Sequence, residues 1–84
     1  MQTIQAKLMR AEQDLTGPVS VELDAGAGPF AQWWGTVRAP LGVSLPIGPC
    51  RLVLSNSLSF PIIIERKLDD CRSFFLGLGP VPQV

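Results

Sequence analysis

The 84-residue chain contains no histidine and no tyrosine. Histidine is the commonest general base and a frequent metal ligand, so its absence excludes a Ser-His-Asp triad and a Cys-His pair. Ser-Lys and carboxylate-only chemistry are not excluded. A zinc site would need both cysteines plus two carboxylates, and Cys50 and Cys71 have no C-x-x-C partner. The sequence therefore predicts a protein that is not an enzyme and that uses neither a metal nor another cofactor.

Charged residues are also scarce. They make up 17% of the chain, below the usual quarter of a globular protein, and seven basic residues balance seven acidic ones. A neutral chain provides no electrostatic footprint for a nucleic acid or an anionic membrane, which argues against both as partners. Hydrophobic residues reach 46%. A small domain of this composition tends to expose apolar surface, and a homo-oligomer or a protein partner is the natural cover for it.

Long apolar runs are missing as well. No stretch approaches the roughly 18 apolar residues of a membrane-spanning helix. The first fifteen residues lack the basic region and unbroken apolar stretch of a signal peptide. Two cysteines are too few for a disulfide scaffold, and both are expected to pack as small hydrophobic residues. These features predict a cytoplasmic protein with no membrane segment.

Eight glycines and eight prolines divide the chain into segments whose lengths suit strands better than long helices. Apolar patterning predicts strands over Val19–Leu23, Phe30–Arg38, Cys50–Ser55, Phe60–Arg66 and Arg72–Leu78. The interval Leu41–Ile47, broken by Gly42 and Pro46, is expected to be a connection that covers one end of the core. We predict a single domain over residues 1–78, followed by an extended, polyproline-like tail over residues 79–84.

The first fifteen residues fit two structures. Four apolar residues have helical spacing, and Gly17-Pro18 is a helix-stop signal; the four are Ile4, Leu8, Ala11 and Leu15. Alternation of Ile4, Ala6 and Leu8 with polar neighbours indicates a strand instead. A strand over Thr3–Arg10, antiparallel to Pro18–Leu23, is favoured because the remainder of the chain is all-β.

Five or six short strands in a chain of this length leave few architectures. We predict an all-β fold, a small five- to six-stranded antiparallel barrel or half-open barrel, because closure removes sheet edges. The alternative is an α+β domain in which a helix over residues 3–15 packs on an antiparallel sheet.

Two adjacent tryptophans mark a candidate binding surface. Neighbouring side chains of a strand point to opposite faces, so Trp33 is expected in the core while Trp34 and Arg38 point outward. An exposed Trp beside an Arg can stack on a base, a sugar or a side chain, with Arg51 as a further candidate cation. Alternatively, Trp34 is covered by the Leu41–Ile47 connection or by another subunit.

Three consecutive isoleucines interrupt the alternation of the hairpin Cys50–Arg66. The register assigns Ile62 and Ile64 to the core and leaves Pro61 and Ile63 outside. Proline donates no ladder hydrogen bond, so Pro61 is expected at an edge or a bulge. The outward Ile63 must then be covered either by a connection of its own chain or by a second subunit, and Pro61 and Ile63 are the candidate interface residues.

The densest polar cluster is Asp69-Asp70-Cys71-Arg72. Two carboxylates beside Cys71 disfavour its thiolate unless Arg72 or another cation offsets them. Aspartate favours turn geometry, so the cluster is predicted to be a charged turn between two strands.

These patterns predict a non-enzymatic interaction or assembly module that self-associates through apolar strand surface. The alternative is a small barrel that binds nucleic acid or a small ligand through Trp34, Arg38 and Arg51.

Overall fold

The computed structural model describes residues 2–27 and 31–81. Within these ranges it contains strands and no helix: β1 (Gln2–Arg10), β2 (Gln13–Asp14), β3 (Val19–Ala25), β4 (Trp33–Arg38), β5 (Gly48–Leu54), β6 (Ser59–Lys67) and β7 (Arg72–Gly77). The prediction of an all-β fold is confirmed. No helix in the described part of the chain is long and apolar enough to cross a membrane.

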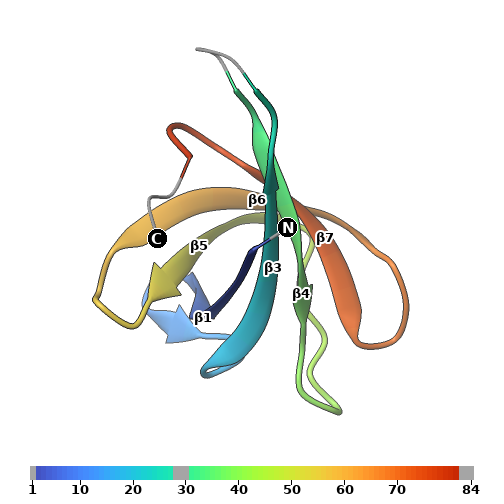
Figure 1. The fold of residues 1–84 in the computed structure, drawn as a ribbon. Coiled ribbons are helices and arrows are strands. Elements are labelled where there is room, and N and C mark those ends of the chain that lie inside the picture. The colour runs from blue at the N-terminus through green and yellow to red at the C-terminus, as the bar shows by residue number, and fades with distance from the viewer. Residues whose placement is uncertain (1, 28–30, 82–84) are drawn as a thin grey trace.

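Six strands form a closed antiparallel barrel in the order β1-β3-β4-β7-β6-β5, and β5 pairs again with β1 (Figure 1). The short strand β2 pairs only with the end of β1. The barrel consists of two meanders, β1-β3-β4 and β5-β6-β7, that meet along two seams. One seam pairs β4 with β7, and the other pairs residues 6–9 of β1 with residues 51–54 of β5.

The N-terminal segment is a strand because both of its sides find partners. β1 pairs with β3 from Gln2↔Leu23 to Ala6↔Val19, and then with β5 from Ala6 onward. Inward-pointing Ala6 and Leu8 are buried in the core. Long-range pairing therefore overrides the helical propensity of these residues, and the helix over residues 3–15 does not form.

The β5–β6 hairpin has the predicted faces. Leu52, Leu54, Ile62 and Ile64 are buried, whereas Pro61 is exposed and Ile63 is half-buried. The carbonyl of Pro61 accepts a 3.0 Å hydrogen bond from the N–H of Leu78, just beyond the last β6–β7 pair, Ile62↔Gly77. The N–H and C=O groups of one residue in an antiparallel strand point toward the same neighbouring strand. Pro61 therefore lacks its N–H on the side of β7, just where β7 ends. The register shift between β6 and β7 lies further along, between Ile64 and Arg66.

Trp33 is the largest side chain of the core and is only 1% exposed. Its indole packs edge-on against Phe60 and Phe75, with ring centroids 6.3 and 6.1 Å away. Its Nε1 donates a 3.3 Å hydrogen bond to the carbonyl of Gly79. The same indole lies so close to Gly77 that a Cβ there would overlap its ring.

The segments between and after the strands agree with the sequence in part. In the connection from β4 to β5, Ala39 and Leu45 are buried in the core, whereas Leu41 is fully exposed at a turn closed by a 3.0 Å hydrogen bond from Val43 to Pro40. The strand expected from Phe30 begins at Trp33, and Phe30 lies outside the described residues. Of the predicted tail over residues 79–84, Val81 packs against the core and residues 82–84 lie outside the described ranges.

Candidate interaction surface

The outer side of the barrel carries a row of apolar side chains that runs across three adjacent strands. Ile63 of β6 is paired with Leu76 of β7, and Leu76 is paired with Trp34 of β4. Directly paired residues of antiparallel strands point to the same face. Phe74 and Pro61 extend the row along β7 and β6. We call these five residues the outer apolar face: Trp34, Pro61, Ile63, Phe74 and Leu76.

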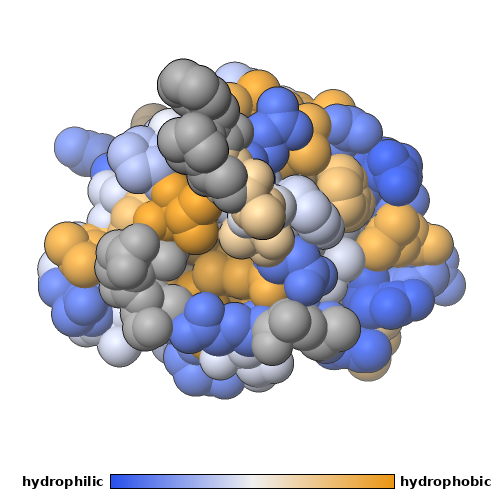
Figure 2. Space-filling view, turned by 45° about the horizontal axis from the view of Figure 1, so that its top comes forward, coloured by the Kyte–Doolittle hydropathy of each residue, from blue (hydrophilic) through white to orange (hydrophobic). Residues whose placement is uncertain are grey.

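The outer apolar face is accessible to solvent. Leu76 at its centre is 37% exposed, Pro61 is exposed, and the other three members are half-buried among their neighbours. One interpretation of the sequence was that the Leu41–Ile47 connection covers Trp34. Trp34 lies near the start of β4, whereas this connection follows the other end of the strand, so it does not cover the tryptophan (Figure 1). Hydrophobic residues also reach the surface in separate patches among hydrophilic ones on the end of the barrel seen in Figure 2.

Charged side chains border the outer apolar face on both flanks. On β3, Asp24 is paired with Trp34, and Glu22 is paired with Thr36. On β6, the guanidinium of Arg66 lies 4.6 Å from the centre of the Phe74 ring and 3.1 Å from Glu65 Oε1. The central apolar row itself carries no charged residue, which is the arrangement of a surface that loses water on binding.

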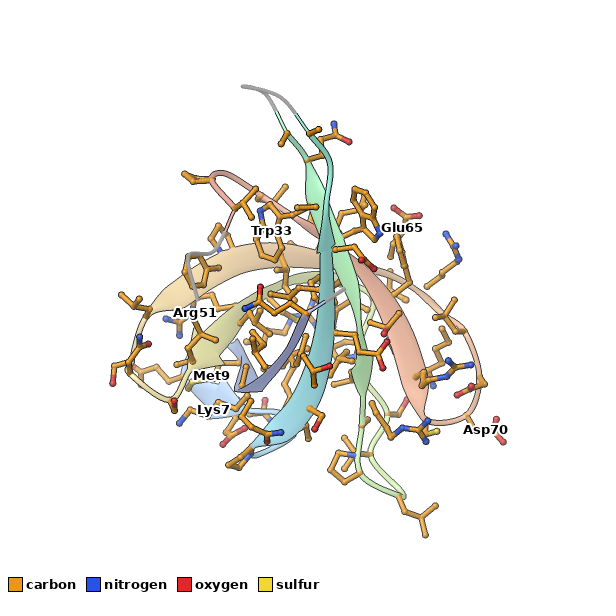
Figure 3. All side chains as sticks on the ribbon, viewed as in Figure 1. Lys7, Met9, Trp33, Arg51, Glu65 and Asp70 are labelled. Atoms are coloured by element: carbon orange, nitrogen blue, oxygen red, sulfur yellow. The ribbon has the colours of Figure 1, made fainter. Side chains whose placement is uncertain are left out.

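The structure separates the three residues of the predicted ligand-binding face. Arg38 lies four residues along β4 from Trp34 and donates a 3.3 Å hydrogen bond from Nη1 to Cys71 Sγ. Arg51 lies three strands away on β5, where its Nη2 donates to the carbonyl of Ala11 over 2.6 Å. In Figure 3, Arg51 lies near Met9, its partner on β1; on its other side Arg51 is paired with Pro61, at the β5 flank of the outer apolar face. By contrast, Trp34, Pro61 and Ile63, predicted from separate segments, come together on one face.

The polar cluster after β6 forms a hydrogen-bonded turn. Asp69 Oδ1 accepts hydrogen bonds from the backbone N–H groups of Cys71 (3.0 Å) and Arg72 (2.8 Å), and Oδ2 accepts one from Arg72 Nε (2.7 Å). The side-chain hydrogen bond from Arg72, followed by the backbone bond from Cys71, holds the pKa of Asp69 well below its usual range. The carboxylate therefore organises the turn that joins β6 to β7.

Acid should weaken this turn. The pKa of Asp69 is lower in the folded chain than the usual value of about 3.9. The ionised carboxylate therefore stabilises the folded chain fully above about pH 3.9, and this stabilisation is lost as the pH falls below that value. We expect the melting temperature of the wild type to fall more between about pH 5 and pH 2 than that of Asp69→Asn, whose amide does not titrate. Parallel curves in thermal denaturation across this range would contradict the assignment.

Both cysteines are free thiols. Burial raises the pKa of Cys50 above its usual value, and nearby Arg10 offsets part of that rise. Cys50 therefore packs as a small hydrophobic residue, whereas Cys71 is half-exposed between Arg38 and Asp69. Among the described residues, no group of three or more Cys, Asp or Glu side chains is placed to hold a metal ion.

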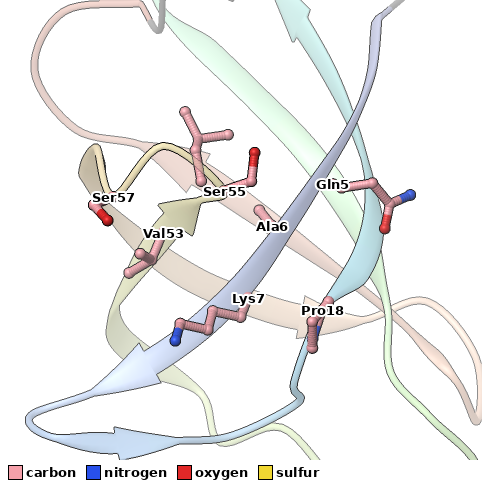
Figure 4. Close-up of a pocket in the computed structure, with 8 residues that line it drawn as sticks. Gln5, Ala6, Lys7, Pro18, Val53, Ser55 and Ser57 are labelled. Carbon is pink, nitrogen blue, oxygen red and sulfur yellow. The ribbon is translucent and has the colours of Figure 1, made fainter.

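A shallow hollow of about 230 Å³ lies on another side of the barrel, over the seam between β1 and β5 (Figure 4). Its lining holds one charged side chain, Lys7; the full set is Gln5, Ala6, Lys7, Pro18, Val53, Leu54, Ser55 and Ser57. Ligand pockets usually exceed roughly 300 Å³ and gather several polar groups around one point. This hollow provides no pair of titratable groups for acid–base chemistry.

Comparison with protein-family models, with curated proteins and with solved structures gave no match. Sequence reasoning did not single out Phe74 and Leu76, although both lie in the predicted strand Arg72–Leu78. The sequence does contain a signal for them. Four of the seven residues in this strand are large and apolar, and they occupy both the inward and the outward positions, as Ile62–Ile64 do.

Proposed function

We propose that this chain is a non-enzymatic assembly module that self-associates through the outer apolar face. The observation that carries the proposal is the continuous row Ile63–Leu76–Trp34 across β6, β7 and β4. A single exposed apolar residue on a strand needs no explanation, but a contiguous patch on a sheet face commonly marks an interaction site.

A second copy fits this face because neither partner brings an excess of charge. The net charge of the chain is zero, so two copies do not repel each other at long range. The charged flanks carry both signs, with Glu22 and Asp24 on β3 and Arg66 on β6. A neutral, symmetric contact between identical apolar rows is the usual form of a homodimer interface.

The area limits how tight such a dimer can be. Full burial of one large apolar side chain contributes about 1.5–3 kcal/mol. However, the wall of a barrel is convex, and three strands spaced about 4.8 Å apart give a contact roughly 15 Å wide. Such a contact is smaller than the standard interface of about 800 Å² per partner. We therefore expect a dissociation constant in the micromolar range.

The alternative, a barrel that binds nucleic acid or a small ligand through Trp34, Arg38 and Arg51, requires these side chains on one surface. Arg38 is engaged with Cys71 at the other end of β4 from Trp34, and Arg51, paired with Pro61 on β5, is engaged with Ala11. The geometry gives this alternative no support beyond the accessibility of Trp34 itself.

Sedimentation velocity or light scattering over a range of concentrations tests the proposal. The wild type should change from monomer to dimer as the concentration rises through the micromolar range. Leu76→Glu should remain monomeric, because a charge at the centre of the row would have to be buried without a partner.

Leu41→Glu is the matched control. It introduces the same charge at a leucine that is 102% exposed, on the turn after β4. This variant should dimerise like the wild type. A wild type that remains monomeric at the highest concentration, or a control that dissociates as fully as Leu76→Glu, would refute the proposal.

A further inference from the structure

We infer that two copies pack about a two-fold axis that passes over Leu76 and runs along the strands, so that Trp34 of each chain packs on Ile63 of the partner subunit. This inference rests on the proposed self-association and specifies its geometry. It follows from the order of side chains across the face, which is Asp24, Trp34, Leu76, Ile63 and Pro49 on β3, β4, β7, β6 and β5.

The centre of the apolar row is Leu76, with Trp34 on one side and Ile63 on the other. A convex wall makes its closest contact over a single strand, and apolar burial is greatest when that strand is the central one, β7. The two-fold axis must then pass over Leu76, which meets its own copy. Only the direction of the axis remains to be decided.

A two-fold axis along the strands reverses the order of the apolar row in the partner subunit relative to the first subunit. Each Trp34 therefore meets Ile63 of the partner subunit. A large side chain then faces a medium one on both sides of the axis, and the gap between the barrels is even. An axis across the strands sets Trp34 against its own copy at one end and Ile63 against its own copy at the other. That arrangement holds the barrels apart on the tryptophan side and leaves a void on the isoleucine side, which close packing disfavours.

The charges favour the same direction. An axis across the strands places Asp24 opposite its own copy at the rim, where like charges repel. An axis along the strands instead places Asp24 opposite Pro49, and Arg66 opposite Thr36 of the partner subunit. The latter pair follows from the second row of the face, Arg66–Phe74–Thr36. Phe74, like Leu76, then meets its own copy.

A charge-rescue experiment tests this geometry with three variants: Trp34→Lys, Ile63→Glu and the double variant. Each single substitution sets a lone charge against an apolar side chain of the partner and should weaken dimerisation about tenfold or more. In the double variant, each lysine meets a glutamate of the partner subunit, and the affinity should recover by about tenfold over either single variant. Within one chain, positions 34 and 63 are two strand spacings apart with Leu76 between them, so the rescuing Lys–Glu pair is the one formed between subunits.

Mixing the two single variants provides a second readout. The mixture forms one Lys–Glu contact and one native Trp34–Ile63 contact per dimer, so it should associate more tightly than either variant alone. If Leu76→Glu abolishes dimerisation but the double variant is no tighter than the singles, the face is correct and the inferred axis is refuted. If the wild type is monomeric, both the axis and the proposed function fail. Circular dichroism of each variant confirms that the barrel is folded.

Discussion

Replacing Trp33 with alanine should lower the free energy of unfolding by about 3–5 kcal/mol, a large part of the stability of an 84-residue domain. The substitution removes the largest side chain of the core, its edge-on contacts with Phe60 and Phe75, and the hydrogen bond from its Nε1 to Gly79. The cavity would lie between β4 and the end of β7, where neighbouring side chains cannot collapse without moving the strands. Urea denaturation followed by circular dichroism measures the loss.

The adjacent Trp34 provides the matched control, since it is the same residue type on the opposite side of the same strand. Its side chain is half-buried on the outer side of the strand, so Trp34→Ala should cost only about 1 kcal/mol. The two alanine variants therefore differ in what they disturb: Trp33→Ala removes part of the core, whereas Trp34→Ala changes the proposed association surface. Equal losses of stability would contradict the assignment of the two faces.

Replacing Gly35 with alanine should cost about 3 kcal/mol, although it adds a single methyl group. A Cβ at this position would overlap the carbonyl oxygen of Glu22 on β3 and approach Phe75 Cζ to 2.7 Å. The carbonyl belongs to the backbone of a paired strand and the ring is buried in the core, so neither can move aside cheaply. The expected change is a separation of β3 from β4, measured as a lower denaturation midpoint.

Gly26→Ala is the control for this substitution. A Cβ at Gly26 would make only an ordinary contact, 3.6 Å from the carbonyl oxygen of Gln32, and its backbone conformation is accessible to alanine. Its effect should be within about 0.5 kcal/mol. If both alanine variants were neutral, the close approach of β3, β4 and Phe75 would be refuted.

The faces of the strands could be predicted from the sequence because side-chain direction on a strand depends only on parity. This rule places Trp33 inside and Trp34 outside, and it separates Ile62 and Ile64 from Ile63. The closed barrel could also be predicted, since strand lengths and turn signals leave few alternative architectures for a small chain. The choice between helix and strand at the N-terminus was not secure, because it depends on pairing with β5, about 45 residues away.

The candidate surface could be predicted only in pieces. Trp34 and Ile63 were each identified as outward residues, but nothing in the local sequence shows that a single strand, β7, lies between β4 and β6. Strand order across a seam is a long-range property that alternation does not encode. For the same reason, Phe74 and Leu76 were not recognised as the link between them. Alternation places Arg38 on the outer side with Trp34, and Arg51 was added for its charge; the fold leaves Arg38 at the other end of β4 and Arg51 on β5, paired with Pro61.

The order of strands around the barrel has a consequence for synthesis on the ribosome. The outer apolar face combines β4 with β6 and β7, which follow it along the chain, and β7 lies between the other two. A nascent chain therefore cannot present the row Trp34–Leu76–Ile63 until β7 has emerged. Before β7 is in place, Trp34 lacks the neighbouring strand that completes the face, so any pairing of two copies through this face requires a barrel that contains β7.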